Sequence, residues 1–200
     1  VQENGPNSLS LVFTDFLGDY DDDRIRSLLE DLLENRDFFW RPTAAAALSR
    51  QGRTEHRELF LQFLGDTLWG VREACLQGLT ALADPDTAEA IRPHLADPVY
   101  DVRAAAARAL HALGDPAGLP VLVEALSNTT RWFEIDYGQK AREDALEFLQ
   151  SLSGQDFGFK PWESSDRRAA GLDRWHRWMT DRDPDWQSKV PPTARSRTDD

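Results

Sequence analysis

The chain has 200 residues, of which 40% are hydrophobic and 29% are charged, so one packed globular domain is expected. Its formal net charge of −12 argues against binding to nucleic acid or anionic lipid, because like charges repel. No stretch approaches the roughly 18 consecutive apolar residues that a membrane span requires.

In chain order, residues 7–17 predict an amphipathic helix that covers the first unit of a repeat. The repeat itself occupies residues 22–152. Asp97 and Arg103 frame the segment Asp-Pro-Val-Tyr-Asp-Val-Arg, and an Ala-rich helix ending at Ala109–Leu113 follows it. Asp66 and Arg72 stand 31 residues earlier, and Asn35 and Arg41 stand 31 residues before those. Such a fixed period is typical of a solenoid.

A fourth copy begins at Asn128 but loses the register. The pattern resumes at Ala145–Leu149, which we align with Ala109–Leu113, so about five residues are inserted. Each copy predicts two helices, and the first helices are expected at 24–33, 55–64, 87–95 and 119–126. The second helices carry apolar residues at helical spacing, as in Val102, Ala105, Ala106, Ala109, Leu110 and Leu113.

This pattern of an apolar helix, Asp-Pro-x-x-x-Val-Arg and an Ala-rich helix resembles the HEAT-repeat family. The likeness is strongest to short bacterial HEAT-like repeats, also found in phycobilisome lyases. It implies an all-α, right-handed α-α superhelix of about four helix pairs with N- and C-terminal capping helices. It also implies a ladder in which Asp66 and Asp97 bind Arg72 and Arg103. Asn128 has no arginine six residues later, so we expect the ladder to be interrupted there.

Residues 153–181 predict a C-terminal cap that completes one domain over residues 1–181. Gly154 and Gly158 permit turns with positive φ, which would position Phe157, Phe159 and Trp162 to close the end of the solenoid. A ligand-binding loop is the alternative. A helix is expected from about Ser165 to Thr180. Prolines and polar residues predict a flexible tail over 182–200.

No catalytic, metal-binding or cofactor-binding motif stands out, and we expect a protein that is not an enzyme and carries no cofactor. Asp19, Asp21, Asp23 and Glu30 have part of the spacing of a calcium loop, but Arg24 stands where its glycine is required. These acids better fit the start of a helix. Cys75 is the single cysteine and is expected to be buried in a helix.

Two surfaces favour partner binding. In HEAT-like solenoids the second helices line the concave face, so the resemblance implies a groove floored by small residues, including Ala45, Ala104 and Ala107. A merely solvated face is the alternative. The insertion carries aromatic residues that are typical of interfaces, although they would also suit packing beneath the cap. The predicted partner-binding residues are Trp132, Phe133, Tyr137, Arg108, His111, Lys140, Asp144 and Glu147.

We therefore predict a non-catalytic protein-binding scaffold or assembly subunit, whose partner is a peptide, a helix or a subunit of a larger complex. The alternative is an enzyme-accessory role like that of the bilin lyases. A HEAT-like nucleic-acid enzyme fits less well, because acidic residues outnumber basic residues in the expected groove.

Overall fold

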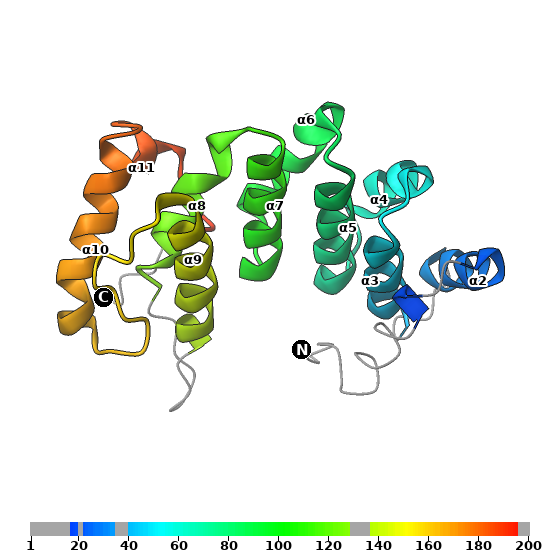
Figure 1. Ribbon diagram of the computed structural model, residues 1–200, viewed down its shortest axis with the longest axis horizontal. Coiled ribbons are helices and arrows are strands. Elements are labelled where there is room, and N and C mark those ends of the chain that lie inside the picture. The colour runs from blue at the N-terminus through cyan, green and yellow to red at the C-terminus, as the bar shows by residue number, and fades with distance from the viewer. Residues whose placement is uncertain (1–16, 20–21, 35–39, 129–136, 196–200) are drawn as a thin grey trace. The chain divides into compact units, whose positions relative to one another are not determined.

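The computed structural model describes residues 17–19, 22–34, 40–128 and 137–195, and every regular element in these ranges is a helix (Figure 1). Helices that follow one another pack in pairs, which confirms the predicted all-α, HEAT-like solenoid fold. The chain divides into two compact units. The N-terminal unit comprises residues 1–93 and 108–115, and the C-terminal unit comprises residues 94–107 and 116–200.

In the N-terminal unit, residues 17–18 are helical, and helices α2 (Asp23–Glu34), α3 (Arg41–Gln51), α4 (Arg57–Phe63) and α5 (Trp69–Leu82) follow. Helix α3 lies between α2 and α5 in Figure 1 and packs against both. Small residues set the spacing of these helices. Gly78 of α5 faces Phe60 of α4 so closely that a Cβ at this position would lie 2.5 Å from the Phe60 ring. The remainder of the predicted leading helix, 7–17, lies outside the described residues.

Three first helices start with a 3-10 turn. The turn Thr54–His56 (η1) precedes α4, Pro85–Thr87 (η2) precedes α6 (Ala88–Ile91), and Pro116–Gly118 (η4) precedes α8 (Leu119–Ala125). The helix expected over 87–95 is broken, because a second 3-10 segment, η3 (Arg92–Ala96), follows α6. Pro93 explains the break, since it has no N–H to continue the α-helical hydrogen bonds.

The C-terminal unit contains the first part of α7 (Tyr100–Ala112), then η4, α8, α9 (Tyr137–Ser153), α10 (Ser165–Thr180) and α11 (Trp186–Lys189). Helix α8 packs against α9, α10 and α11. Gly118 meets Ala107 so closely that a Cβ would lie 2.4 Å from the Ala107 Cα. The core of this unit gathers side chains from every helix, including Leu122, Leu149, Trp175 and Trp186.

The repeat arginines bind the turns that precede their own helices. Arg72 Nη1 donates to the Asp66 carbonyl oxygen at 2.8 Å, and Arg103 Nη1 donates to the Asp97 carbonyl oxygen at 2.7 Å. The carboxylate of Asp66 accepts from Leu68 N at 2.8 Å and pairs with Arg41 of the preceding repeat. The predicted contacts of both arginines with their turns are therefore confirmed, but the bonds are made to carbonyl oxygens.

The ladder also continues into the fourth copy, so the expected interruption at Asn128 is wrong. Arg142 Nη1 donates to the Asn128 carbonyl oxygen, as Arg103 does to that of Asp97. The separation is 14 residues instead of six, which makes the insertion eight residues long rather than about five. The burial of Ala141, Ala145 and Leu149 agrees with this register, in which they match Val102, Ala106 and Leu110.

The segment between α9 and α10 has the predicted turns. Gly154 and Gly158 have φ of 69° and 67°, and Phe157 also has a positive φ of 52°. Phe159 is buried, and Phe157 packs edge-on against Trp175 with ring centroids 4.8 Å apart. Trp162 is the exception, because it is 64% exposed and does not close the core.

Residues 182–195 differ from the flexible tail that the sequence predicts for 182–200. Trp186 and Val190 are buried in the core of the C-terminal unit. The hydroxyl of Thr193 donates to the Ala96 carbonyl oxygen at 2.9 Å, although 97 residues separate the two in sequence. Two large apolar side chains in a polar segment are sufficient to dock it, because burial of each stabilises the fold by about 1.5–3 kcal/mol.

Candidate functional site

The base of the insertion is organised around Arg142, whose side chain is fully buried. Its Nε donates to the Pro161 carbonyl oxygen at 2.9 Å, and its Nη1 donates to that of Asn128. Gly138, near the start of α9, fits against the same group, since a Cβ there would lie 2.8 Å from the Asn128 oxygen and 2.9 Å from Arg142 Nη1. The two ends of the insertion therefore meet at one guanidinium.

Five of the eight predicted site residues have described side chains. Trp132 and Phe133 lie outside the described residues, as does the side chain of Tyr137, the first residue of α9. Lys140 is exposed and forms an ion pair with Asp144 one helical turn later. Glu147, one turn further, is exposed. These three residues form a solvated stripe on α9, where charges can attract a partner without a large desolvation cost.

Arg108 and His111 lie on the last turns of α7 and are partly buried. They belong to the N-terminal unit, whereas Lys140, Asp144 and Glu147 belong to the C-terminal unit. The structure therefore supports the α9 stripe as a local surface and leaves the wider set of site residues as a prediction.

The groove floor of small residues is a wrong prediction. Ala45, Ala104 and Ala107 are buried, and Ala104 and Ala107 belong to the core of the C-terminal unit. On an Ala-rich helix, short side chains let the next helix approach, so neighbouring elements cover positions that a helical-wheel analysis leaves open.

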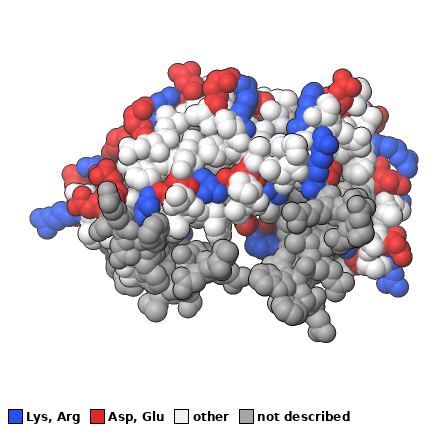
Figure 2. Space-filling model, turned by 180° about the vertical axis from the view of Figure 1, so that it is seen from behind, with Lys and Arg blue, Asp and Glu red and all other residues white. Residues whose placement is uncertain are grey.

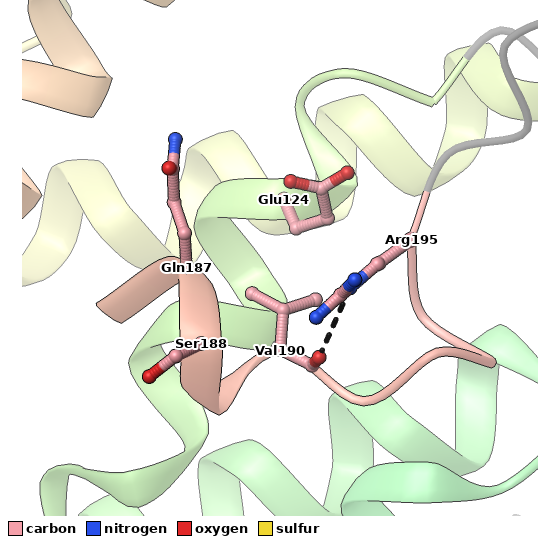
Figure 3. Close-up of a pocket in the computed structure, with 5 residues that line it drawn as sticks. All are labelled: Glu124, Gln187, Ser188, Val190 and Arg195. Atoms are coloured by element: carbon pink, nitrogen blue, oxygen red, sulfur yellow. Dashed lines mark hydrogen bonds between the residues drawn. The ribbon is translucent and has the colours of Figure 1, made fainter. Parts of the chain in front are cut away.

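A polar pocket of about 460 Å³ lies between α8 and the segment that follows α10 (Figure 3). It is lined by Glu124, Gln187, Ser188, Val190 and Arg195. Figure 3 shows Arg195 beside Val190, to whose carbonyl oxygen Arg195 Nε donates at 3.4 Å. The lining offers a carboxylate, a guanidinium, an amide and a hydroxyl, and the Ser188 hydroxyl donates to the Asp185 carbonyl oxygen at 2.7 Å. The sequence prediction missed this pocket because four of the five residues fall in the predicted tail.

Trp162 is held on a fixed backbone although its ring faces solvent. Arg142 binds the carbonyl oxygen of Pro161 on one side, and Arg168 binds that of Glu163 on the other. Both arginines are buried. In the described residues, Trp162 and Leu28 are the two large hydrophobic side chains that are exposed. No sequence signal distinguishes Trp162 from the buried tryptophans, because Arg142, which holds one side of its loop, lies 19 residues from Pro161 in sequence.

Charged side chains of both signs are interspersed over the face in Figure 2. Near the N-terminus, Asp19 pairs with Arg50 at 3.0 Å and Asp23 pairs with Arg26 at 2.9 Å. Asp22 accepts from Arg24 N at 2.8 Å, as expected of a helix cap. The described residues contain no group of three or more His, Cys, Asp or Glu side chains that could hold a metal ion.

The single thiol is in an apolar environment. Cys75 is buried on α5, and this burial raises the pKa of its thiol to about 12. A thiol with so high a pKa is protonated at neutral pH and is a poor nucleophile or metal ligand. Its predicted burial is confirmed.

Comparison with known proteins agrees with this architecture. A family model described as HEAT repeats matches residues 57–134, a range that runs from α4 to the insertion. No curated protein shows a sequence match to the chain. Among the described helices, none is both long enough and apolar enough to cross a membrane. Residues 57–134 are thus similar to HEAT repeats in sequence, and they lie within an all-helical, HEAT-like solenoid fold.

Proposed function

We propose that the chain is a non-catalytic protein-binding scaffold or assembly subunit. HEAT repeats generally act as scaffolds for protein interactions, and residues 57–134 match this family. The proposed docking surface joins the aromatic insertion to the charged stripe on α9. It comprises Trp132, Phe133 and Tyr137 with Lys140, Asp144 and Glu147.

The observation that carries the proposal is the closed base of the insertion. Arg142 keeps the ladder bond to Asn128 although eight extra residues intervene, so the repeat does not need those residues to complete its turn. A segment that stability does not require, yet which carries a tryptophan and a phenylalanine, suits an interface. A few aromatic residues can each contribute about 2 kcal/mol or more to binding.

The neighbouring charges support the same role. The exposed residues Lys140 and Glu147 flank Asp144 on the solvent side of α9, which resembles the polar rim of a protein interface. A partner that covers the insertion could therefore reach charges of both signs.

The resemblance to phycobilisome lyases suggests an alternative, an accessory role in bilin attachment. The burial of Cys75 gives no support to a bilin held through this chain's own thiol. An absorbance scan after incubation with bilin tests the alternative, since a visible band would favour it.

The experiment for the leading proposal is capture of partners from the native host, followed by mass spectrometry. The double variant Trp132→Ala, Phe133→Ala should lose the captured partner while its helical circular dichroism stays unchanged. The matched control is Leu28→Ala, which removes an exposed apolar side chain from α2 and should leave capture intact. Unfolding of the double variant would place the insertion in the core and overturn the proposal, as would capture at the wild-type level.

A further inference from the structure

The imidazole of His56 is buried at the junction between α2 and η1. The residue is 1% exposed and packs edge-on against Phe60, with ring centroids 5.9 Å apart. Neither ring nitrogen has a hydrogen-bond partner among the described residues. The carboxylate of Glu30 on α2 lies beside the ring, with its Oε1 3.4 Å from Nε2. Buried polar atoms usually have partners, so this ring calls for a physical explanation.

The charges that face His56 balance one another and are already paired. Glu30 and Arg26 come from α2, Glu55 comes from η1, and Arg53 directly precedes η1. Arg26 pairs with Glu55 at 3.1 Å and lies 4.0 Å from Glu30, while Arg53 pairs with Glu55 at 2.7 Å. A proton on His56 would add one positive charge beside carboxylates that are already shared with Arg26 and Arg53, and Arg26 also pairs with Asp23 at the surface.

A neutral ring suits this position better than a charged one. Protonation would give the ring two N–H donors, of which one faces Glu30 and the other has no acceptor among the described residues. Glu30 compensates only partly, because its side chain is 38% exposed and water screens its charge. Burial accordingly lowers the pKa of His56, while Glu30 and Glu55 oppose the shift.

We propose that His56 is a pH-sensitive latch between α2 and η1, closed while the ring is neutral and loosened when the ring is protonated. Helix α2 is the element that would move. It is held by Leu29 and Leu33 in the core, by the Arg26–Glu55 pair, and by a bond from Arg41 Nε to the Leu33 carbonyl oxygen at 3.0 Å. Detachment of α2 hydrates the ring, so each proton bound at His56 favours the open form.

Opening of the latch exposes the apolar face of α2 and the surface of α3 beneath it. Leu29 and Leu33 are buried in the closed form, so acidification would uncover an apolar surface on the N-terminal unit. Proton binding would thereby regulate access to a face that is hidden at neutral pH.

Hydrogen exchange of the full chain, followed by mass spectrometry at about pH 7.5 and about pH 5.5, tests the latch. After correction for intrinsic rates, exchange of α2 should accelerate by up to about tenfold at the lower pH, because a hydrated histidine with a pKa of about 6.5 is then mostly protonated. His176 packs on Trp186 in the unit that contains α9, and its pKa is lowered by burial. Helix α9, which has no histidine of its own, is therefore the internal control in the His176→Phe variant, where it should not respond.

Two variants separate the latch from a general loss of stability. His56→Phe keeps an aromatic ring against Phe60 and should abolish the acid response of α2. Glu30→Gln removes the compensating carboxylate and should enlarge that response. NMR titration of His56, assigned by comparison with His56→Phe, should give a pKa below that of an exposed histidine. A raised pKa, or α2 exchange that is unchanged or slower at low pH, would overturn the proposal.

Discussion

Arg142 donates a hydrogen bond to the backbone carbonyl of Asn128 across 14 residues of sequence, in place of the six that separate Arg103 from Asp97. The same guanidinium binds Pro161, at the start of the loop that carries Trp162. One buried side chain thus joins the last repeat, the base of its insertion and the C-terminal cap.

Replacement of Arg142 by Ala should therefore destabilise the C-terminal unit strongly. One buried and one partly buried carbonyl oxygen would lose their donor, at a cost of about 3 kcal/mol, so Tm should fall by roughly 6–12 °C in a chain of this size. Arg92→Ala is the control, because Arg92 makes ion pairs on the surface that contribute little. Equal melting of the two variants would show that the Arg142 bonds do not contribute to stability.

The ladder arginine Arg103 gives a second prediction. It is buried, bonds to the carbonyl oxygens of Asp97 and Pro98, and lies over the Tyr100 ring at 5.8 Å. Bonds from a charged donor contribute about 1.5–3 kcal/mol, so Arg103→Ala should lower Tm by several degrees in thermal melts. The exposed Arg177 is a matched control, and Arg177→Ala should melt like the wild type. An unchanged melt for Arg103→Ala would contradict the ladder's role.

His176 predicts a pH dependence of stability in the C-terminal unit. Burial lowers the pKa of His176, while Glu124 and Asp173 oppose this shift, and the ring packs on Trp186 at 5.3 Å. The unfolded chain then takes up the proton at a higher pH than the folded chain. Stability should accordingly be complete above the ordinary histidine pKa of about 6.5 and decrease as the pH falls below it.

Melts of the wild type and of His176→Phe across this range provide the measurement. The variant should lose less of its Tm on acidification, by the order of a few degrees, because one of the groups that take up protons on unfolding is absent. Parallel pH profiles would contradict the assignment. The same melts with His56→Phe separate the contribution of the N-terminal unit.

The docked segment after α10 predicts the effect of shortening the chain. A chain that ends at Asp181 lacks Trp186 and Val190, and it also lacks the bond from Thr193 to Ala96. Loss of a buried tryptophan costs about 3–5 kcal/mol, so this chain should unfold at a Tm lower by roughly 6–20 °C. A chain that ends at Arg195 is the control and should melt normally. Normal melting of the shorter chain would mean that the segment only rests on the surface.

The fold class and most helix positions follow from the sequence, because the 31-residue period and the apolar spacing can be recognised from neighbouring residues. The register of the fourth copy cannot be derived in this way. An Ala-Leu-x-x-Leu pattern fits an amphipathic helix equally well when it is shifted by three residues, and both alignments bury Ala145 and Leu149. The bond from Arg142 to Asn128 decides between them, and such a bond is visible only when the turn is folded.

In the C-terminal segments, too, the sequence predicts local structure better than tertiary contacts. The residue type correctly identifies Gly154 and Gly158 as turn residues, since positive φ is a local requirement. The residue type cannot show that Trp162 is exposed and Trp186 is buried, because apolar residues also occur on surfaces. Segments that are distant in sequence, such as α8, cover Trp186. Polar residues around Trp186 suggested a tail, whereas two buried side chains are enough to fix its path.

The buried Cys75 is a natural probe of local unfolding in the N-terminal unit. The chain has no second cysteine, and the thiol is protonated and shielded within α5, so a thiol reagent can label it only during moments when the N-terminal unit opens. The rate of labelling therefore counts those openings in the unmodified chain, without an introduced dye or mutation.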